Sequence, residues 1–200
     1  MILAKPDGIS LKDHTDHVKA EAEYILSARP FFTKKYSAIT GKNLEELLIR
    51  SAEYHDKGKA HKQWQAACQK DFEQFKNTGF LNAKHLRHAG IRHEFASIDY
   101  CAQNKILLEQ EELVSIAAHH RKLSRFHQPR LEKEGWTNIF NSILRLNHQI
   151  PQLSRDNLKQ IIEKKYRFAG PRALLQLADH RASSRESGEN PPELLPFEYT

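Results

Sequence analysis

Apolar residues recur every three or four positions along most of the chain, the spacing typical of amphipathic helices. The first predicted helix begins after Ser10, which is placed to cap it, and ends before Pro30. His14 lies at the edge of its apolar face, whereas His17 is turned further towards solvent. His14 is therefore the better candidate for a buried functional histidine. The apolar face is formed by Leu11, Val18, Ala22 and Ile25.

A second helix is predicted to start at Asn43, an N-cap with Glu46 three residues later, and to end at Gly58. Its apolar face ends at His55. This inward imidazole needs a partner, because an unpaired buried polar group costs about 1–3 kcal/mol. Asp56 follows directly, and imidazole with carboxylate is a ligand set that divalent metals accept. A hydrogen-bonded histidine near a helix end would give the same pair, so a metal site requires further ligands elsewhere.

The remaining pattern completes an all-α fold with a proline-rich end. Residues 31–42 are aromatic and basic and predict a loop packed on the core. The segment at 188–200 reads as a tail or linker. Gly170-Pro171 is expected to open the last helix, since proline is tolerated in the first helical turn. Other helices are expected over residues 61–76, 91–108, 111–120, 136–148 and 156–168.

Two segments combine basic residues with other functional side chains. The first is a predicted loop that carries Lys84, His85, Arg87 and His88, and it fits either a solvated connector or a strand-binding lip beside a site. The second, residues 121–136, interleaves aromatic and basic side chains, as single-stranded nucleic acid sites do. An ordinary loop anchored by two hydrophobic residues would give the same pattern. Its key members are Arg121, Lys122, Arg125, Phe126 and Trp136.

Length and composition favour one soluble cytoplasmic domain. Two hundred residues suffice for a substantial helical core. Cys68 and Cys101 are the only cysteines and imply no disulfide framework, which favours a reducing compartment. No apolar run approaches the roughly 18 residues of a membrane span, and none at the N-terminus resembles a signal peptide. The net charge of +6 favours a polyanionic partner such as nucleic acid.

Twelve histidines are a high number for this length, and three positions need particular attention. With helical spacing, His93 and Ser97 fall on the polar face of their helix. His93 is therefore predicted to be exposed, unless a functional site lies on that polar face. The adjacent His119 and His120 point about 100° apart, so both reach one ion only near a helix end or beside a second metal. An exposed pair is the alternative. Asp179 lies among apolar residues and therefore needs a metal, Arg or Lys partner.

Five short stretches carry these candidates: Leu11-Lys-Asp-His14-Thr-Asp-His-Val18, His55-Asp-Lys-Gly-Lys59, Arg92-His93-Glu-Phe-Ala-Ser97, Ile116-Ala-Ala-His-His120 and Leu177-Ala-Asp179-His-Arg-Ala-Ser183. In this order the chain resembles the HD superfamily of metal-dependent phosphohydrolases. More narrowly, it is similar to the HD nuclease domain of the type I CRISPR-associated helicase-nuclease. The resemblance implies a single HD-domain helical bundle over residues 1–187, with the metal site in a core cleft and a tail or linker at 188–200.

The resemblance also implies two divalent metal ions that share Asp56. Mixed histidine and aspartate ligands fit Mn, Fe, Co or Ni, with Mg possible. Lys59 would lie near the scissile phosphate and act with Asp56 in catalysis, and His88 is an alternative ligand to His93. The first ion would be held also by His14, His55 and Asp179, and the second by His93, His119 and His120.

The implied activity is cleavage of single-stranded DNA in CRISPR interference. The helicase would be a partner chain or a following domain, beside the CRISPR effector complex, since no helicase motif occurs in these residues. One alternative is an HD phosphohydrolase acting on nucleotides or cyclic dinucleotides. Another is a catalytically silent DNA-binding module. The expected DNA contacts are Lys59, Ser97, Arg121, Lys122, Arg125 and Ser183.

Overall fold

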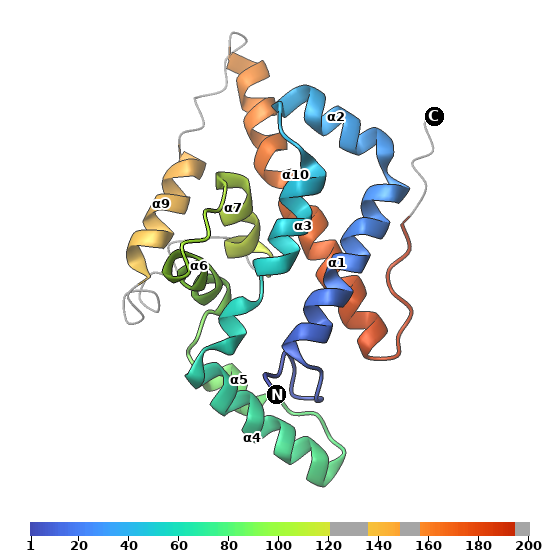
Figure 1. Cartoon of the computed structure of the whole chain (residues 1–200), viewed down its shortest axis with the longest axis vertical. Coiled ribbons are helices and arrows are strands. Elements are labelled where there is room, and N and C mark those ends of the chain that lie inside the picture. Colours follow the sequence, from blue (N-terminus) through green and yellow to red (C-terminus); the bar gives the residue numbers. More distant parts are fainter. Residues whose placement is uncertain (121–135, 149–156, 195–200) are drawn as a thin grey trace.

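The computed structural model describes residues 1–120, 136–148 and 157–194, which form a helical bundle (Figure 1). No strand occurs among these residues, apart from one isolated bridge between Leu3 and Ser10, so the predicted all-α class is confirmed. The elements are α1 (Leu11–Ala28), α2 (Pro30–Thr40), α3 (Leu44–Tyr54), the 3-10 helix η1 (Lys57–Ala60), α4 (Lys62–Thr78), α5 (Lys84–His88), α6 (His93–Gln103), α7 (Gln110–Ala118), α9 (Thr137–His148) and α10 (Leu158–Glu186).

Two apolar clusters organise the bundle. One joins α1, α3 and α10, and the other joins α6, α7 and α9. The C-terminal end of α3 lies between them, because η1 follows it directly and packs against α6. This end of α3 is where His55 and Asp56 occur. The first cluster contains Val18, Ala22, Ile25, Leu48, Ala52, Leu175, Ala178 and Ala182, and the second contains Phe95, Ile98, Ile116, Ala117, Phe140 and Ile143.

Both predicted N-caps are confirmed. The Ser10 hydroxyl accepts a hydrogen bond from the backbone N–H of Asp13, 3.0 Å away. The Asn43 side chain accepts from the N–H groups of Glu45 and Glu46. Each cap satisfies backbone donors that the first helical turn leaves unpaired, which stabilises the helix by about 1 kcal/mol.

The prediction of a loop at residues 31–42 was wrong, because this segment contains α2. Pro30 was interpreted only as the end of the preceding helix, but it also occupies the first turn of α2, where its missing N–H has no cost. Gly41 ends α2 with a φ of 68°. Only Tyr36 of α2 is fully buried, so the helix presents a weak apolar pattern. The basic loop expected at residues 84–88 is likewise a short helix, α5.

The C-terminal helix differs from its predicted form. In place of two helices separated before Pro171, α10 runs unbroken through that proline. A proline lacks the N–H that would pair with the carbonyl four residues earlier, here that of Arg167. The Tyr36 hydroxyl donates to this carbonyl over 2.8 Å and replaces the missing bond. A side chain at Gly170 would come within 3.2 Å of the Tyr36 ring, so this glycine lets the ring approach.

The described part of the proline-rich segment packs on the bundle. The Arg181 guanidinium donates to the carbonyl of Pro192, and Leu194 contacts the cluster formed by α1, α3 and α10. Residues 188–194 therefore follow the surface of the domain. None of the described helices combines the length and apolar character that crossing a lipid bilayer requires.

We expect Tyr36→Phe to lower the free energy of unfolding by about 1–3 kcal/mol, because it leaves the Arg167 carbonyl without a donor. Urea denaturation measures the change. Pro171→Ala supplies a backbone N–H to the same carbonyl, so this substitution should recover most of the loss in the Tyr36→Phe background. If Tyr36→Phe lowers the free energy of unfolding by the same amount in the wild type and in the Pro171→Ala variant, the hydrogen bond does not support the helix.

Candidate metal centre

Five segments bring seven histidine and aspartate side chains to one place between the two apolar clusters. These are the residues that the resemblance assigned to metal binding, and they lie on helices or directly after helix ends. His93 opens α6, while the two adjacent histidines follow the last residue of α7. The set consists of His14 on α1, His55 and Asp56 after α3, His93 on α6, His119 and His120 after α7, and Asp179 on α10.

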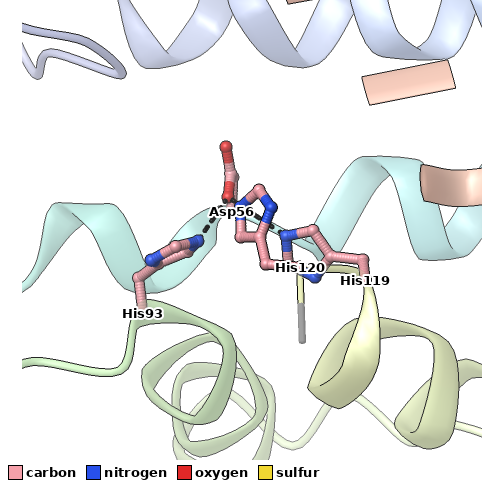
Figure 2. Close-up of side chains that lie close together, drawn as sticks. All are labelled: Asp56, His93, His119 and His120. Carbon is pink, nitrogen blue, oxygen red and sulfur yellow. Dashed lines mark ion pairs between the residues drawn. The ribbon is translucent and has the colours of Figure 1, made fainter. Parts of the chain in front are cut away.

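Asp56 lies at the centre, with its two carboxylate oxygens facing different histidines. Oδ2 is 3.3 Å from His14 Nε2 and 3.4 Å from His55 Nε2. Oδ1 is 3.3 Å from His93 Nε2 and 3.9 Å from His119 Nε2. Figure 2 shows Asp56 reaching from the chain after α3 towards His93 on one side and His119 on the other. One side chain thus contributes to two groups.

Polar atoms without partners mark this centre. Among the described residues, the Nε2 atoms of four of these histidines and Oδ1 of Asp56 are buried and have no hydrogen-bond partner. Oδ2 of Asp56 has only its ion pair with Lys59. Such atoms are rarely left unsatisfied, since each costs about 1–3 kcal/mol. A cation at the centre would satisfy all of them at once, so the residues fit a metal site. The four histidines are His14, His55, His93 and His119.

Backbone carbonyls orient two of the imidazoles. The Nδ1 atom of His55 donates to the Ala52 carbonyl over 2.8 Å, and that of His119 donates to the Ile116 carbonyl over 2.7 Å. A carbonyl only accepts, so Nδ1 carries the proton and Nε2 presents its lone pair to the centre. Burial lowers the pKa of both rings, which keeps them neutral as ligands must be.

The ligand atoms fall into two sets that share Asp56. In the first set, atoms of Asp56, His93, His119 and His120 lie within 4.8 Å of one another, and in the second the same holds for His14, His55 and Asp56. Asp179 lies between the sets. Its Oδ1 is 3.2 Å from His14 Nε2, and its Oδ2 is 3.7 Å from His120 Nδ1. The arrangement could hold two ions bridged by a carboxylate.

Negative charge concentrates around His14. Burial alone would lower its pKa, but Asp179, Asp56 and Glu186 outweigh burial and raise the pKa to about 10. Three carboxylates around one imidazole are an environment that favours a cation strongly. A divalent metal ion would supply the positive charge that this environment requires.

Lys59 adds a fixed positive charge. Its Nζ lies 2.5 Å from Asp56 Oδ2, and it is also 5.7 Å from the centre of the Trp64 ring. Burial alone would lower the pKa of Lys59, but Asp56 and Asp179 outweigh it and raise the pKa. The ammonium is therefore charged at neutral pH. That Lys59 lies near the scissile phosphate remains a prediction.

Gly58 has a different role from the one predicted. Helix α3 ends at Tyr54, and Gly58 lies inside η1 without a left-handed φ, so it does not end the helix. A Cβ at Gly58 would stand 2.1 Å from the His93 carbonyl oxygen and 2.5 Å from the Ser97 nitrogen. Glycine is required because the backbone of α6 passes directly over this position. This close contact brings His93 to Asp56.

The prediction that Ser97 contacts DNA was wrong. Its side chain is buried, accepts a hydrogen bond from the Gly58 N–H over 2.8 Å, and lies 2.7 Å from the His55 carbonyl oxygen. It joins α6 to η1 and cannot reach a strand. Ser183, another predicted contact, is half-buried on α10. The predicted contacts Arg121, Lys122 and Arg125 lie outside the described residues.

The prediction of an exposed His93 was also wrong, although the resemblance had placed it at the site. The His93 side chain is 15% exposed, because α6 is buried on two faces, one against η1 and one against α7 and α9. Helical spacing identifies the buried side of a helix only when a single face is buried. The alternative ligand His88 is exposed at the end of α5, with its Nδ1 2.7 Å from the Lys84 carbonyl, and belongs to neither ligand set.

Sequence reasoning missed Glu186. Its side chain is 1% exposed, and its two oxygens lie 3.0 Å from His14 Nδ1. Further contacts join it to His17 Nδ1 at 2.8 Å and to Lys5 Nζ at 2.6 Å. Glu186 follows Asp179 by seven positions, two helical turns, so both share a face of α10. That spacing was visible in the sequence and could have identified it.

A helical bundle with a His-Asp pair inside a buried histidine and aspartate cluster defines an HD-type metal-dependent hydrolase. The family described as "Cas3, HD domain" matches residues 4–186. The chain therefore belongs to the HD nuclease domains of Cas3-type CRISPR proteins, which are metal-dependent nucleases. This membership confirms the resemblance identified in the sequence. No curated protein and no solved structure shows significant similarity to the chain.

We expect Glu186→Gln to weaken metal binding by about 10–100-fold, because the amide loses the charge that orients and polarises His14. Isothermal titration of metal-stripped protein with Mn²⁺ measures the affinity. Glu53→Gln is a matched control, since Glu53 also bridges two cations, Lys19 and Lys57, but contacts no histidine of the centre. Equal affinities of the two variants would show that Glu186 does not support the metal.

Proposed function

We propose that the chain is a two-metal nuclease that cleaves single-stranded DNA in CRISPR interference. A helicase subunit, or a helicase domain that follows in a longer chain, would supply the strand. The observation that carries this proposal is the Asp56 carboxylate. Its two oxygens face two separate groups of buried imidazole nitrogens, and these nitrogens have no hydrogen-bond partner among the described residues. Two ions that share a carboxylate are an arrangement used for phosphodiester hydrolysis.

Each proposed ion would have both imidazole and carboxylate ligands. One would be held by Asp56, His14, His55 and Asp179, and the other by Asp56, His93, His119 and His120. This mixed set favours Mn, Fe, Co or Ni, with Mg as a possible weaker occupant. When bound, the metals supply an activated water and stabilise the charge that develops on the phosphate and the leaving oxygen.

The residues of the chain itself hold this chemistry in place. The Ala52 and Ile116 carbonyls keep Nε2 of His55 and His119 directed inwards, so the ligands need no rearrangement. Lys59 keeps a positive charge beside Asp56, where an anionic phosphate would be attracted. Burial of Asp56, His14 and His55 excludes bulk water from one side of the centre, which strengthens these electrostatic interactions.

Substrate access supports a preference for single strands. Among the proposed ligands, the His120 side chain is 33% exposed and that of His93 is 15% exposed, while the others are nearly inaccessible. A phosphate would therefore approach from the side of His93 and His120. A single strand can bend its backbone into such a restricted site, whereas a duplex is stiff over about 150 base pairs.

We also propose that residues 1–187 form the nuclease domain, that 188–200 connect it to further chain or form a tail, and that the protein acts in the cytoplasm. Two observations support the last point. Cys68 and Cys101 are both free and buried, as suits a reducing compartment. The CRISPR family to which the chain belongs acts on nucleic acid.

We expect metal-stripped protein to cleave labelled single-stranded DNA only after Mn, Co or Ni is added back. Asp56→Asn should lower the rate at least about 1,000-fold, because it removes the carboxylate that both ions share. Glu21→Gln is the matched control. Glu21 is also buried, but it pairs with Arg181 and Arg185 and lies outside both ligand sets. It should retain metal-dependent cleavage.

The same assay separates the alternatives. Nucleoside triphosphates and cyclic dinucleotides are tested beside single-stranded and duplex DNA. If only nucleotides are hydrolysed, the protein is a nucleotide phosphohydrolase and the nuclease proposal is wrong. Binding of DNA without metal-dependent cleavage, unchanged in Asp56→Asn, would identify a silent binding module.

A further inference from the structure

A second feature of the surface is a groove of about 410 Å³ between α4 and α5. The two helices run antiparallel. Asp71, in the middle of α4, accepts from the N–H groups at the start of α5, and Gln63, at the start of α4, donates to the Ala89 carbonyl just after α5. The groove therefore extends along α4 from its middle back to its first turn. It includes Gln63, Ala67 and Lys70 from one side and Lys84, His85 and His88 from the other.

The groove is positively charged. None of the described residues that line it is a carboxylate. Lys70 and Lys84 are exposed and form no ion pair with any described residue, and neither does Arg87, which donates to the uncharged Asn82 side chain and the Ala83 carbonyl. By contrast, Lys19 and Lys57 on neighbouring helices pair with Glu53. Positive charge without internal partners suits a polyanionic ligand.

An aromatic residue lies in the loop that leads into this groove. Phe80, between α4 and α5, is 68% exposed. Aromatic faces beside a positive groove bind single-stranded nucleic acid by base stacking, with sites of about 4–16 nucleotides. The combination favours a strand over an acidic protein surface as the ligand.

The inner end of the groove points towards the metal centre. Trp64, the residue after Gln63, packs against His93 with ring centroids 6.5 Å apart. Along the chain, His93 follows Ala89 by four positions, a span of at most about 14 Å. His93 and His120 form the more exposed side of the centre. The groove thus ends beside the side from which a phosphate would enter.

We propose that the groove between α4 and α5 binds the sugar-phosphate backbone of single-stranded DNA and leads it to the His93 side of the metal centre. This inference rests on the proposed nuclease function and adds the path of its substrate. In Figure 1, α4 and α5 form one end of the molecule and α2 lies at the other. Lys34 and Lys35 on α2 are exposed, have no described ion pair, and therefore provide a control of equal charge.

The test compares Lys70→Gln/Lys84→Gln with Lys34→Gln/Lys35→Gln in the metal-loaded protein. Binding of a labelled 20-nucleotide strand is measured by fluorescence anisotropy over a range of salt concentrations. We expect the groove variant to bind about tenfold more weakly near physiological salt. The slope of log K against log salt concentration should be about 1.4 shallower, because two phosphate contacts are lost. The control variant should retain the wild-type slope.

Cleavage adds a second measurement. The groove variant should hydrolyse a small chromogenic phosphodiester as fast as wild type but lose about tenfold in kcat/KM on the 20-nucleotide strand. Equal binding and equal salt slopes in the two variants would overturn the groove as a DNA path. If wild type cleaves neither substrate, the nuclease proposal fails, and the anisotropy comparison still decides whether the groove binds DNA.

Discussion

The buried charge of Asp56 is the constraint on which the site and much of the fold depend. Burial would raise the pKa of this carboxyl, but the charged Lys59 ammonium and the His14 ring outweigh burial and hold the pKa well below its usual range. An ionised carboxylate inside a protein persists only where cations and donors surround it. Three helix ends bring the surrounding side chains to it. The C-terminal ends of α3 and α7 and the N-terminal end of α6 converge on one side chain.

The surrounding structure keeps this convergence rigid. Apolar clusters on both sides hold the helices, while small residues allow the backbones to approach. Gly58 permits α6 to pass over η1, and Ser97 joins the two through buried hydrogen bonds. Outside the ligands, backbone carbonyls orient His55 and His119, and Glu186 contacts His14. In the described part of the chain, most of the buried polar side-chain atoms without a hydrogen-bond partner belong to the centre, and Ser51 Oγ and Glu111 Oε2 are the exceptions.

The fold class and the members of the buried histidine and aspartate cluster could be predicted from the sequence, but the geometry could not. N-caps such as Ser10 and Asn43 are local signals, so they were found correctly. His93 was misplaced by periodicity because a helix buried on two faces has no single apolar stripe. The unbroken α10 was missed because the donor that replaces the Pro171 N–H comes from Tyr36, which is distant in sequence. Predicting the role of Glu186 requires its two-turn spacing from Asp179 and also the position of His14, which the sequence does not give.

The most direct test of the central claim is whether Asp56 bridges two ions. Metal-stripped protein is loaded with Mn²⁺, the bound metal is counted per chain, and the electron paramagnetic resonance spectrum is recorded for wild type and Asp56→Asn. We expect two Mn²⁺ with an exchange-coupled spectrum, because ions that share a carboxylate lie about 3.5–4 Å apart, and loss of the coupling in the variant. A single bound ion, or two uncoupled ions whose spectrum is unchanged in Asp56→Asn, would contradict it.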